Sequence, residues 1–373
     1  MIDLDSYAAS FDGEPGYLDW AAFGPLSPSV RSEVQADADL LGSGRRSSID
    51  LISEHDREAR DALAELIGTD ADHVTLQPST TYGLMHAFFG LTGGLLLARS
   101  EFPSLTIAGT RAAGLTGRVT LQLFDTEDGF VTPESVRDAL TDDTTAIAVS
   151  LVDFRTGFRA DLGAIRDVIG DRLLIVDAIQ GFGVVDADYG AADVVCGHGY
   201  KWLRAGRGTG FASFSDEARE RIEPVLSGFG AVDGDLPVDT LPAPSATVHA
   251  YGVSAPDHLA AARLAAAAQE AADVGVGVIE AALTERVDQV ISLADDHGIP
   301  VLTPREPERR AGIVALAPDP RDAGPLAATL ANYGVVFTTR SGLIRLAPHV
   351  GTDVDTMLML QDALGAAGAS YIV

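Results

Sequence analysis

The chain has 373 residues, a length that suits one large domain plus a smaller one. Hydrophobic residues make up 46% and charged residues 21%, a composition that argues against disorder, collagen and coiled coil. A net charge of −28 repels phosphate backbones and anionic lipid, and we therefore expect no nucleic-acid and no membrane partner. The single cysteine excludes a disulfide framework, and the first residues show no signal-peptide pattern, so we expect a cytoplasmic protein.

Short apolar runs dominate the first two thirds of the chain. They are VTLQ (74–77), GLLLAR (94–99), VTLQLF (119–124), TAIAVSLV (145–152), RLLIVDAI (172–179), ADVVCGHG (192–199) and GTGFASF (208–214). Several are continuous rather than alternating in hydrophobicity, which is typical of strands covered on both faces. Helical patterns over 51–67, 133–140 and 162–170 lie between them. This alternation predicts an α/β fold, with a mostly parallel, seven-stranded sheet between helices.

The last third of the chain follows a different pattern. Residues 227–256 are rich in Gly, Pro and Asp, as in a connector, and an Ala-rich helix is expected over 258–283. Strands are expected at 312–317, 334–339 and 343–347, and a final helix from about Asp353. We interpret this part as a smaller α+β domain. The predicted boundaries are 15–250 for the large domain and 1–14 with 257–373 for the small one.

Lysine is almost absent from the sequence. Of 26 basic residues, 25 are arginine and one, Lys201, is lysine. Arginine can replace lysine in surface charge and in salt bridges, but it cannot act as an amine that loses its proton and attacks a carbonyl. Lys201 is therefore either a chance survivor on a solvated surface or a reactive amine, and its neighbours decide between the two.

Three motifs support the reactive amine. The strand LLIVD ends in Asp177, and a carboxylate buried there needs a cationic partner such as a protonated ring nitrogen. The loop GHGYKW carries Lys201 three residues after His198. The turn PSTTYG (78–83) offers hydroxyls and backbone N–H groups at a helix start, a phosphate site that comprises Ser79, Thr80 and Thr81. An aldehyde cofactor with a phosphate and a pyridine nitrogen fits these groups, and pyridoxal 5′-phosphate is such a cofactor.

From YLDWAAFGPLSPSV near its start to IRLAPHVGT near its end, the chain resembles the class V aminotransferase superfamily of fold-type-I pyridoxal-phosphate enzymes. That superfamily includes cysteine desulfurases, kynureninases and isopenicillin N epimerases. The resemblance implies that Lys201 forms the internal aldimine and later acts as the general base, for which its pKa must be lowered. It also implies that Asp177 pairs with the pyridinium nitrogen.

The same resemblance implies further site residues. It places Gln180 on the phenolic oxygen of the cofactor, Phe102 of the EFPS segment (101–104) on its ring, and Asp153 near a cofactor oxygen. It assigns His198, Thr80 and Thr81 to the phosphate or ring, and Arg345 to the substrate carboxylate. Ser254, beside a Val253 that replaces the threonine of relatives, would reach the phosphate of a neighbouring subunit, which implies a homodimer with a shared active site.

Departures from the family pattern narrow the function. Cysteine desulfurases carry a cysteine before the carboxylate-binding arginine, whereas residues 338–349 have none and Cys196 lies in a strand, so a thiol-dependent desulfurase is not expected. The histidines form no HxxxH or HExxH pattern, and no metal is expected. We interpret Arg155 as a salt-bridged loop residue and His349 as structural.

Three functional classes stay open at this point. We expect an aminotransferase that takes an amino acid and a keto acid. A β-lyase, similar to kynureninase or selenocysteine lyase, and an amino-acid epimerase are the alternatives. A non-catalytic relative is disfavoured because the chain keeps its only lysine together with Asp177 and Arg345.

Overall fold

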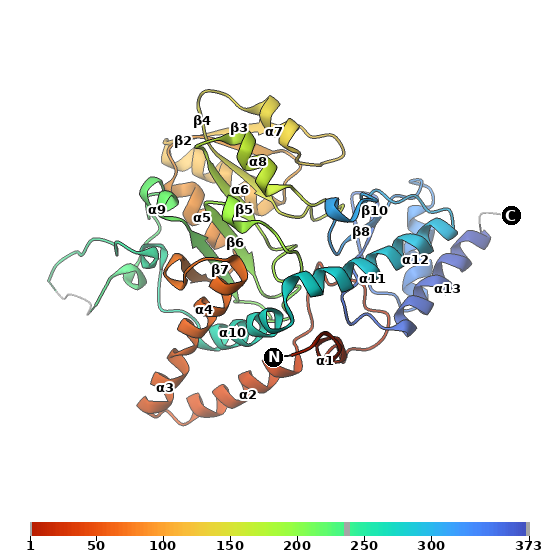
Figure 1. Ribbon diagram of the computed structural model, residues 1–373, viewed down its shortest axis with the longest axis horizontal. Coiled ribbons are helices and arrows are strands. Elements are labelled where there is room, and N and C mark those ends of the chain that lie inside the picture. Colours follow the sequence, from red (N-terminus) through yellow and green to blue (C-terminus); the bar gives the residue numbers. More distant parts are fainter. Residues whose placement is uncertain (1, 235–238, 371–373) are drawn as a thin grey trace.

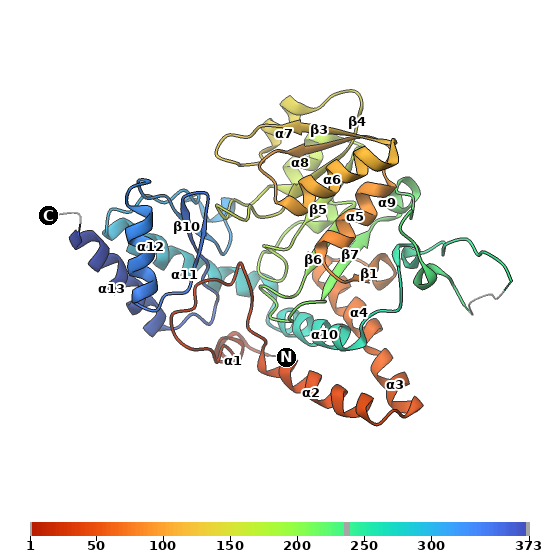
Figure 2. The same ribbon diagram turned by 180° about the vertical axis from the view of Figure 1, so that it is seen from behind.

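The computed structural model describes residues 2–234 and 239–370 (Figure 1). A large unit surrounds a seven-stranded sheet, and a smaller unit surrounds a three-stranded sheet at the other end of the molecule (Figures 1 and 2). The predicted α/β fold with a smaller α+β unit is therefore confirmed.

The seven-stranded sheet has the order β1-β7-β6-β5-β4-β2-β3. Its strands are β1 (Val74–Gln77), β2 (Gly93–Ala98), β3 (Val119–Phe124), β4 (Thr144–Ser150), β5 (Leu173–Asp177), β6 (Val194–His198) and β7 (Gly210–Phe214). β7 is antiparallel to both of its neighbours, and the other pairs are parallel. The C-terminal ends of β1, β2, β4, β5 and β6 therefore meet at one edge, which is where open α/β sheets bind ligands.

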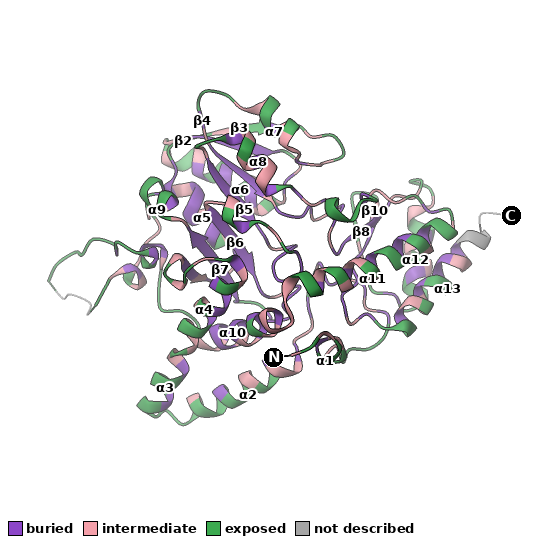
Figure 3. Ribbon diagram, viewed as in Figure 1, coloured by how far each residue is buried: buried purple, intermediate pink, exposed green. Residues whose placement is uncertain are grey.

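Helices cover both faces of this sheet. One face packs against α5 (Thr80–Gly90), α6 (Pro103–Thr116) and α9 (Asp216–Arg221), and the other against α4 (His55–Ile67), α8 (Leu162–Ile169) and α10 (His258–Val274). Alternate strand residues enter the two cores: Leu173 and Ile175 enter the first, and Leu174 and Val176 the second. Double coverage explains why the strands are continuous apolar runs, and Figure 3 shows them buried.

The smaller sheet is antiparallel, with the order β8 (Val314–Leu316), β10 (Leu343–Leu346) and β9 (Thr338–Arg340). It lies with α11 (Val276–Asp296), α12 (Ala323–Asn332) and α13 (Val354–Ser370). The remaining α-helices are α1 (Leu4–Ala9), α2 (Pro28–Gly42), α3 (Arg46–Ser53) and α7 (Pro133–Ala139). Short 3₁₀ turns are η1 (Ala71–His73), η2 (Tyr189–Ala191), η3 (Phe229–Ala231), η4 (Val248–Tyr251) and η5 (Pro307–Arg309).

Two predicted helices differ from the structure. The helix expected over 258–283 is two helices, because Gly275 takes a φ of +89°, ends α10 with an N–H bond to the Ala271 carbonyl and lets α11 start in a new direction. The helix expected over 51–67 is the end of α3 followed by α4. The domain boundaries stay a prediction, and α10 packs against α4 and α2 of the large unit. None of the described helices is long and apolar enough to cross a membrane.

Close packing of α5 on the sheet gives a stability prediction. A Cβ on Gly83 would lie 2.9 Å from Cys196 Sγ and 3.0 Å from Ala212 Cβ, whereas a Cβ on Gly114 of α6 would meet nothing within 4 Å. We expect Gly83→Ala to lower the free energy of unfolding by about 1–3 kcal/mol through overpacking. The matched Gly114→Ala should raise it by about 0.5–1 kcal/mol through helix propensity. Urea denaturation measures both, and equal effects of the two substitutions would contradict this packing.

Candidate active site

The predicted catalytic residues meet at the C-terminal edge of the large sheet. Asp177 is the last residue of β5, His198 is the last of β6, and Lys201 lies in the turn that follows β6. Thr80 begins α5, directly after β1, which runs parallel to β6 because β7 is antiparallel to both. The topology thus gathers residues that lie more than one hundred positions apart in the sequence.

Lys201 and Asp177 form a buried, electrostatically coupled pair. Burial lowers the pKa of Lys201 from 10.5 to about 7; the Asp177 carboxylate opposes this shift, and Arg345 and Arg340 add to it. Burial likewise raises the pKa of Asp177 to about 6, against a hydrogen bond from the Ile179 N–H and the charge of Lys201. Lys201 Nζ makes no hydrogen bond or ion pair within the described part of the chain. Burial therefore favours the neutral, nucleophilic form of this amine more than in an exposed lysine.

Two buried polar atoms on the α5 side of this pair lack partners. Thr80 Oγ1 and His198 Nε2 are both buried and make no hydrogen bond among the described residues. Burial, followed by the charges of Lys201, Arg207 and Arg263, lowers the pKa of His198 to about 3, so its imidazole is neutral. Unsatisfied buried atoms are costly, and a bound group with acceptor and donor atoms would relieve both.

The other predicted phosphate residues flank these atoms. Ser79 precedes α5 as its N-cap and makes no side-chain capping bond, and Thr81 Oγ1 lies 2.9 Å from Ser104 Oγ at the start of α6. Ser254 is exposed and lines a cavity of about 340 Å³ together with Pro78 and Gly210. The structure thus brings Ser254 to a cavity beside the start of α5, while its contact with a neighbouring subunit stays a prediction.

Tyr200 is a residue that the sequence gave little reason to place in the site. Its ring packs edge-on against His198 with centroids 4.5 Å apart, and Lys201 Nζ lies 5.5 Å from its centre. The Arg207 guanidinium lies 4.8 Å from the same ring. Burial raises the pKa of Tyr200 above its ordinary value, so its hydroxyl keeps its proton.

Arg345 is buried and oriented by two contacts. Its Nη1 donates to the Phe154 carbonyl at 2.8 Å and its Nη2 donates to Asp19 Oδ1 at 3.3 Å, whereas its Nε is buried without a partner. Phe154 in turn packs edge-on against Phe102, with centroids 5.0 Å apart. Asp19 was missed in the sequence because it lies 326 positions from Arg345, and no local pattern links the two.

Two predicted cofactor ligands are already engaged by the protein. Gln180 donates from Nε2 to the Ala21 carbonyl and accepts from Trp202 Nε1. Asp153 accepts bonds from the backbone and side chains of residues 155 and 156, on both of its oxygens. Their cofactor contacts stay predictions, and a contact by Gln180 would use its second amide hydrogen.

Three residues that we interpret as structural make contacts consistent with that interpretation, which stays a prediction. Arg155 forms an ion pair with Asp153 at 3.1 Å. His349 is fully buried, with its Nδ1 bonded to the Val350 N–H and its Nε2 bonded to the Trp202 carbonyl. Cys196 is fully buried in β6, and burial raises the pKa of its thiol well above the usual range, which leaves it inert.

Comparison with known proteins settles the family. The family described as aminotransferase class-V matches residues 17–348. The chain belongs to this family. Its cofactor is therefore pyridoxal phosphate, and the resemblance found in the sequence is confirmed.

The relatives of this chain are named for different activities. A kynureninase from Deinococcus radiodurans is 28% identical over 321 residues, which cover 79% of this chain and 76% of that protein. An uncharacterized aminotransferase, YcbU of Bacillus subtilis, is 25% identical over 317 residues, covering 83% and 82%. A structure of C-DES with glycine covalently linked to its PLP cofactor superposes with a TM-score of 0.86 at 19% identity, covering 96% of this chain and 98% of that one.

The residues at the sheet edge fit this cofactor. Thr80 Oγ1 and His198 Nε2 are unsatisfied buried atoms that a phosphate or ring substituent would meet, and Lys201 offers an unpaired amine. Asp177, whose pKa is raised by burial, would become ionised beside a protonated ring nitrogen. The chain therefore supplies polar partners for both the phosphate and the ring nitrogen of pyridoxal phosphate.

The lowered pKa of Lys201 predicts how the cofactor-free protein takes up pyridoxal phosphate. The rate should rise with pH and level off above about 7, because the neutral amine is the attacking form; an ordinary lysine would keep gaining about tenfold per pH unit toward 10. Asp177→Asn removes a group that raises this pKa and should move the inflection to lower pH. Arg340→Gln removes a group that lowers it and should move the inflection to higher pH. Stopped-flow absorbance measures all three rates, and an inflection near 10 would contradict the buried pair.

Proposed function

We propose that this protein is a pyridoxal-phosphate-dependent lyase, which takes the α-proton from an amino acid and then releases a group from its side chain. The observation that carries the proposal is Lys201, the only lysine of the chain, which is buried beside Asp177 with a pKa of about 7. A pKa near the working pH suits a group that both attacks a carbonyl and exchanges a proton. Pyridoxal phosphate, when bound, supplies an aldehyde that takes up amines and a ring that accepts electrons.

Each residue at the sheet edge has a distinct part in this proposal. Lys201, released by the incoming amino acid, removes the proton from its α-carbon and holds it on Nζ. Asp177 stabilises a positive charge at the end of β5. Arg345 binds the substrate carboxylate through two nitrogens, Nε and Nη2. Nε is buried without a partner, and Nη2 makes only a long, weak hydrogen bond of 3.3 Å to Asp19, which the substrate carboxylate would replace.

Tyr200 favours side-chain release over other outcomes. A leaving side-chain group can be protonated by a nearby acid, and Tyr200, whose ring centre lies 5.5 Å from Lys201 Nζ and whose pKa is raised by burial, is the candidate proton donor. The relative named kynureninase, which matches along three quarters of its length, also supports a lyase. The inert Cys196 and the cysteine-free loop of residues 338–349 agree with a lyase that uses no thiol.

Transamination, which the sequence favoured, is the second candidate. The relative named as an uncharacterized aminotransferase spans more of the chain than the kynureninase does, although at lower identity. In this case Lys201 would return its proton to the cofactor side, and a keto acid would be the second substrate. Epimerisation uses the same proton removal and differs only in the face to which the proton returns.

We also propose that the protein is a homodimer in which Ser254 reaches the cofactor phosphate of the neighbouring subunit. Ser254 lines a cavity with Pro78 and Gly210, and among the described residues its hydroxyl bonds only to the next carbonyl, that of Ala255, so it is available to a phosphate. A cytoplasmic location fits the single inert thiol. The homodimer and the cytoplasmic location stay predictions.

A substrate panel separates the candidates. A lyase consumes its amino acid without added keto acid and leaves the cofactor spectrum unchanged at the end, whereas transamination needs a keto acid and leaves the amine form. Tyr200→Phe should lower kcat by about 10²–10⁴-fold while exchange of the α-proton with deuterated water continues. Lys201→Ala should lose both activities. Unchanged turnover by Tyr200→Phe would contradict the lyase assignment, and retained exchange by Lys201→Ala would contradict the whole proposal.

A further inference from the structure

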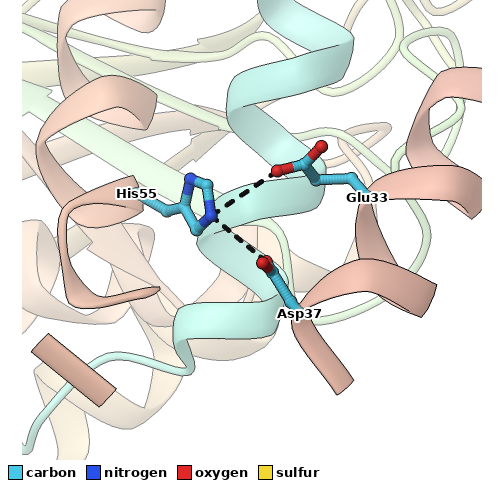
Figure 4. Close-up of side chains that lie close together, drawn as sticks. All are labelled: Glu33, Asp37 and His55. Carbon is cyan, nitrogen blue, oxygen red and sulfur yellow. Dashed lines mark ion pairs between the residues drawn. The ribbon is translucent and has the colours of Figure 1, made fainter. Parts of the chain in front are cut away.

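A group of ionisable side chains lies where α2 meets the start of α4. Glu33 and Asp37 are four residues apart on α2, so they project from the same side of that helix, and His55 is the first residue of α4. Figure 4 shows both carboxylates directed at one nitrogen of His55. His55 Nε2 lies 3.2 Å from Asp37 Oδ2 and 3.5 Å from Glu33 Oε1.

Asp37 is unusual within this group. Its side chain is 5% exposed, and its buried Oδ2 makes no well-aligned hydrogen bond among the described residues, although His55 Nε2 lies 3.2 Å away. His55 is the only basic side chain that pairs with it among the described residues, and Nε2 points between the two carboxylates. No arginine pairs with Glu33 or Asp37 in the described part of the chain. A buried carboxylate oxygen in this state is destabilising unless something binds it.

The second nitrogen of the imidazole is held by another carboxylate. His55 Nδ1 lies 2.7 Å from Glu58 Oε2, one helical turn further along α4. When Nδ1 donates its proton to Glu58 and a metal ion displaces any proton on Nε2, the Nε2 lone pair faces Glu33 and Asp37. A carboxylate behind the histidine is the usual arrangement around metal-bound imidazole, because it fixes the tautomer and orients the ring.

Distances and charges at this site both suit a metal ion. Two atoms bound to one Zn²⁺ at about 2.0–2.1 Å in tetrahedral geometry are about 3.3 Å apart, close to the separations of Nε2 from its two carboxylate neighbours. The atoms of Glu33, Asp37 and His55 lie within 4.8 Å of one another. With Glu58, three carboxylates face one imidazole, a charge of −3 when the histidine is neutral, and a divalent cation reduces it to −1.

We propose that Glu33, Asp37 and His55 form a binding site for a divalent transition-metal ion such as Zn²⁺, with water in the remaining position. The imidazole ligand favours Zn²⁺ and its neighbours in the first transition row over Ca²⁺ or Mg²⁺, which prefer oxygen ligands. The site joins α2 to α4: α2 and α3 extend away from the body of the molecule, whereas α4 packs against α10 beside the large sheet (Figure 1). The metal stabilises this extension, and it lies outside the catalytic site.

Calorimetric titration of the chelator-treated holoenzyme with ZnCl₂, after removal of any affinity tag, tests the proposal. We expect one equivalent to bind and to raise the Tm. Glu33→Gln changes a half-exposed ligand without disturbing the fold and should weaken binding at least about tenfold, and His55→Gln should abolish it. Glu58→Gln, which changes only the group behind the imidazole, should weaken binding about 10–100-fold.

The chain offers a matched control. His73 Nε2 lies 3.1 Å from Asp216 Oδ1, and no second carboxylate of the described residues pairs with that nitrogen. His73→Gln should therefore bind Zn²⁺ like the unaltered protein, which separates the site from general attraction to an acidic surface. The proposal is overturned if the unaltered protein binds no Zn²⁺ at micromolar concentration, or if binding survives in both Glu33→Gln and His55→Gln. Circular dichroism of each variant shows whether it is folded.

Discussion

Burial of one amine and one carboxylate at the same sheet edge is the constraint on which the active site depends. Taking Lys201 and Asp177 out of water disfavours the charge on each, which brings their pKa values to about 7 and about 6. Their mutual attraction opposes both shifts but does not cancel them. The sheet maintains this state because β5 and β6 are central, parallel and covered on both faces, so neither residue can reach solvent without loss of packing.

The charge distribution of the protein supports the same chemistry. Its net charge is −28, yet Arg340 and Arg345 act on Lys201, and Arg207 and Arg263 act on His198. A local excess of guanidinium groups within an acidic molecule attracts anions to the sheet edge and away from the rest of the surface. A cofactor phosphate and an amino-acid carboxylate are both anions. Where α2 meets α4 the opposite imbalance, three carboxylates around one imidazole, suits a cation.

Much of the fold could be predicted because strand and helix patterns are local. The strand over 119–124 has the expected limits, and the single lysine drew attention to Lys201 without any structural information. Contacts between distant segments could not be predicted. Nothing near Asp19 shows that it holds Arg345, and nothing near Gln180 shows that its amide is bonded to Ala21 and Trp202. Gly275 was read as part of a helix because Ala-rich sequence continues on both sides, whereas its positive φ sets the break.

Reduction of the holoenzyme with borohydride, followed by peptide mass spectrometry, tests the central claim most directly. Borohydride fixes the cofactor to the amine that holds it, and Lys201 is the only side-chain primary amine in the sequence. The buried-pair account predicts one equivalent of cofactor mass on the peptide that contains Lys201, and none on that peptide in Lys201→Ala. Cofactor mass found elsewhere, or visible absorption of the bound cofactor that is unchanged in Lys201→Ala, would contradict it.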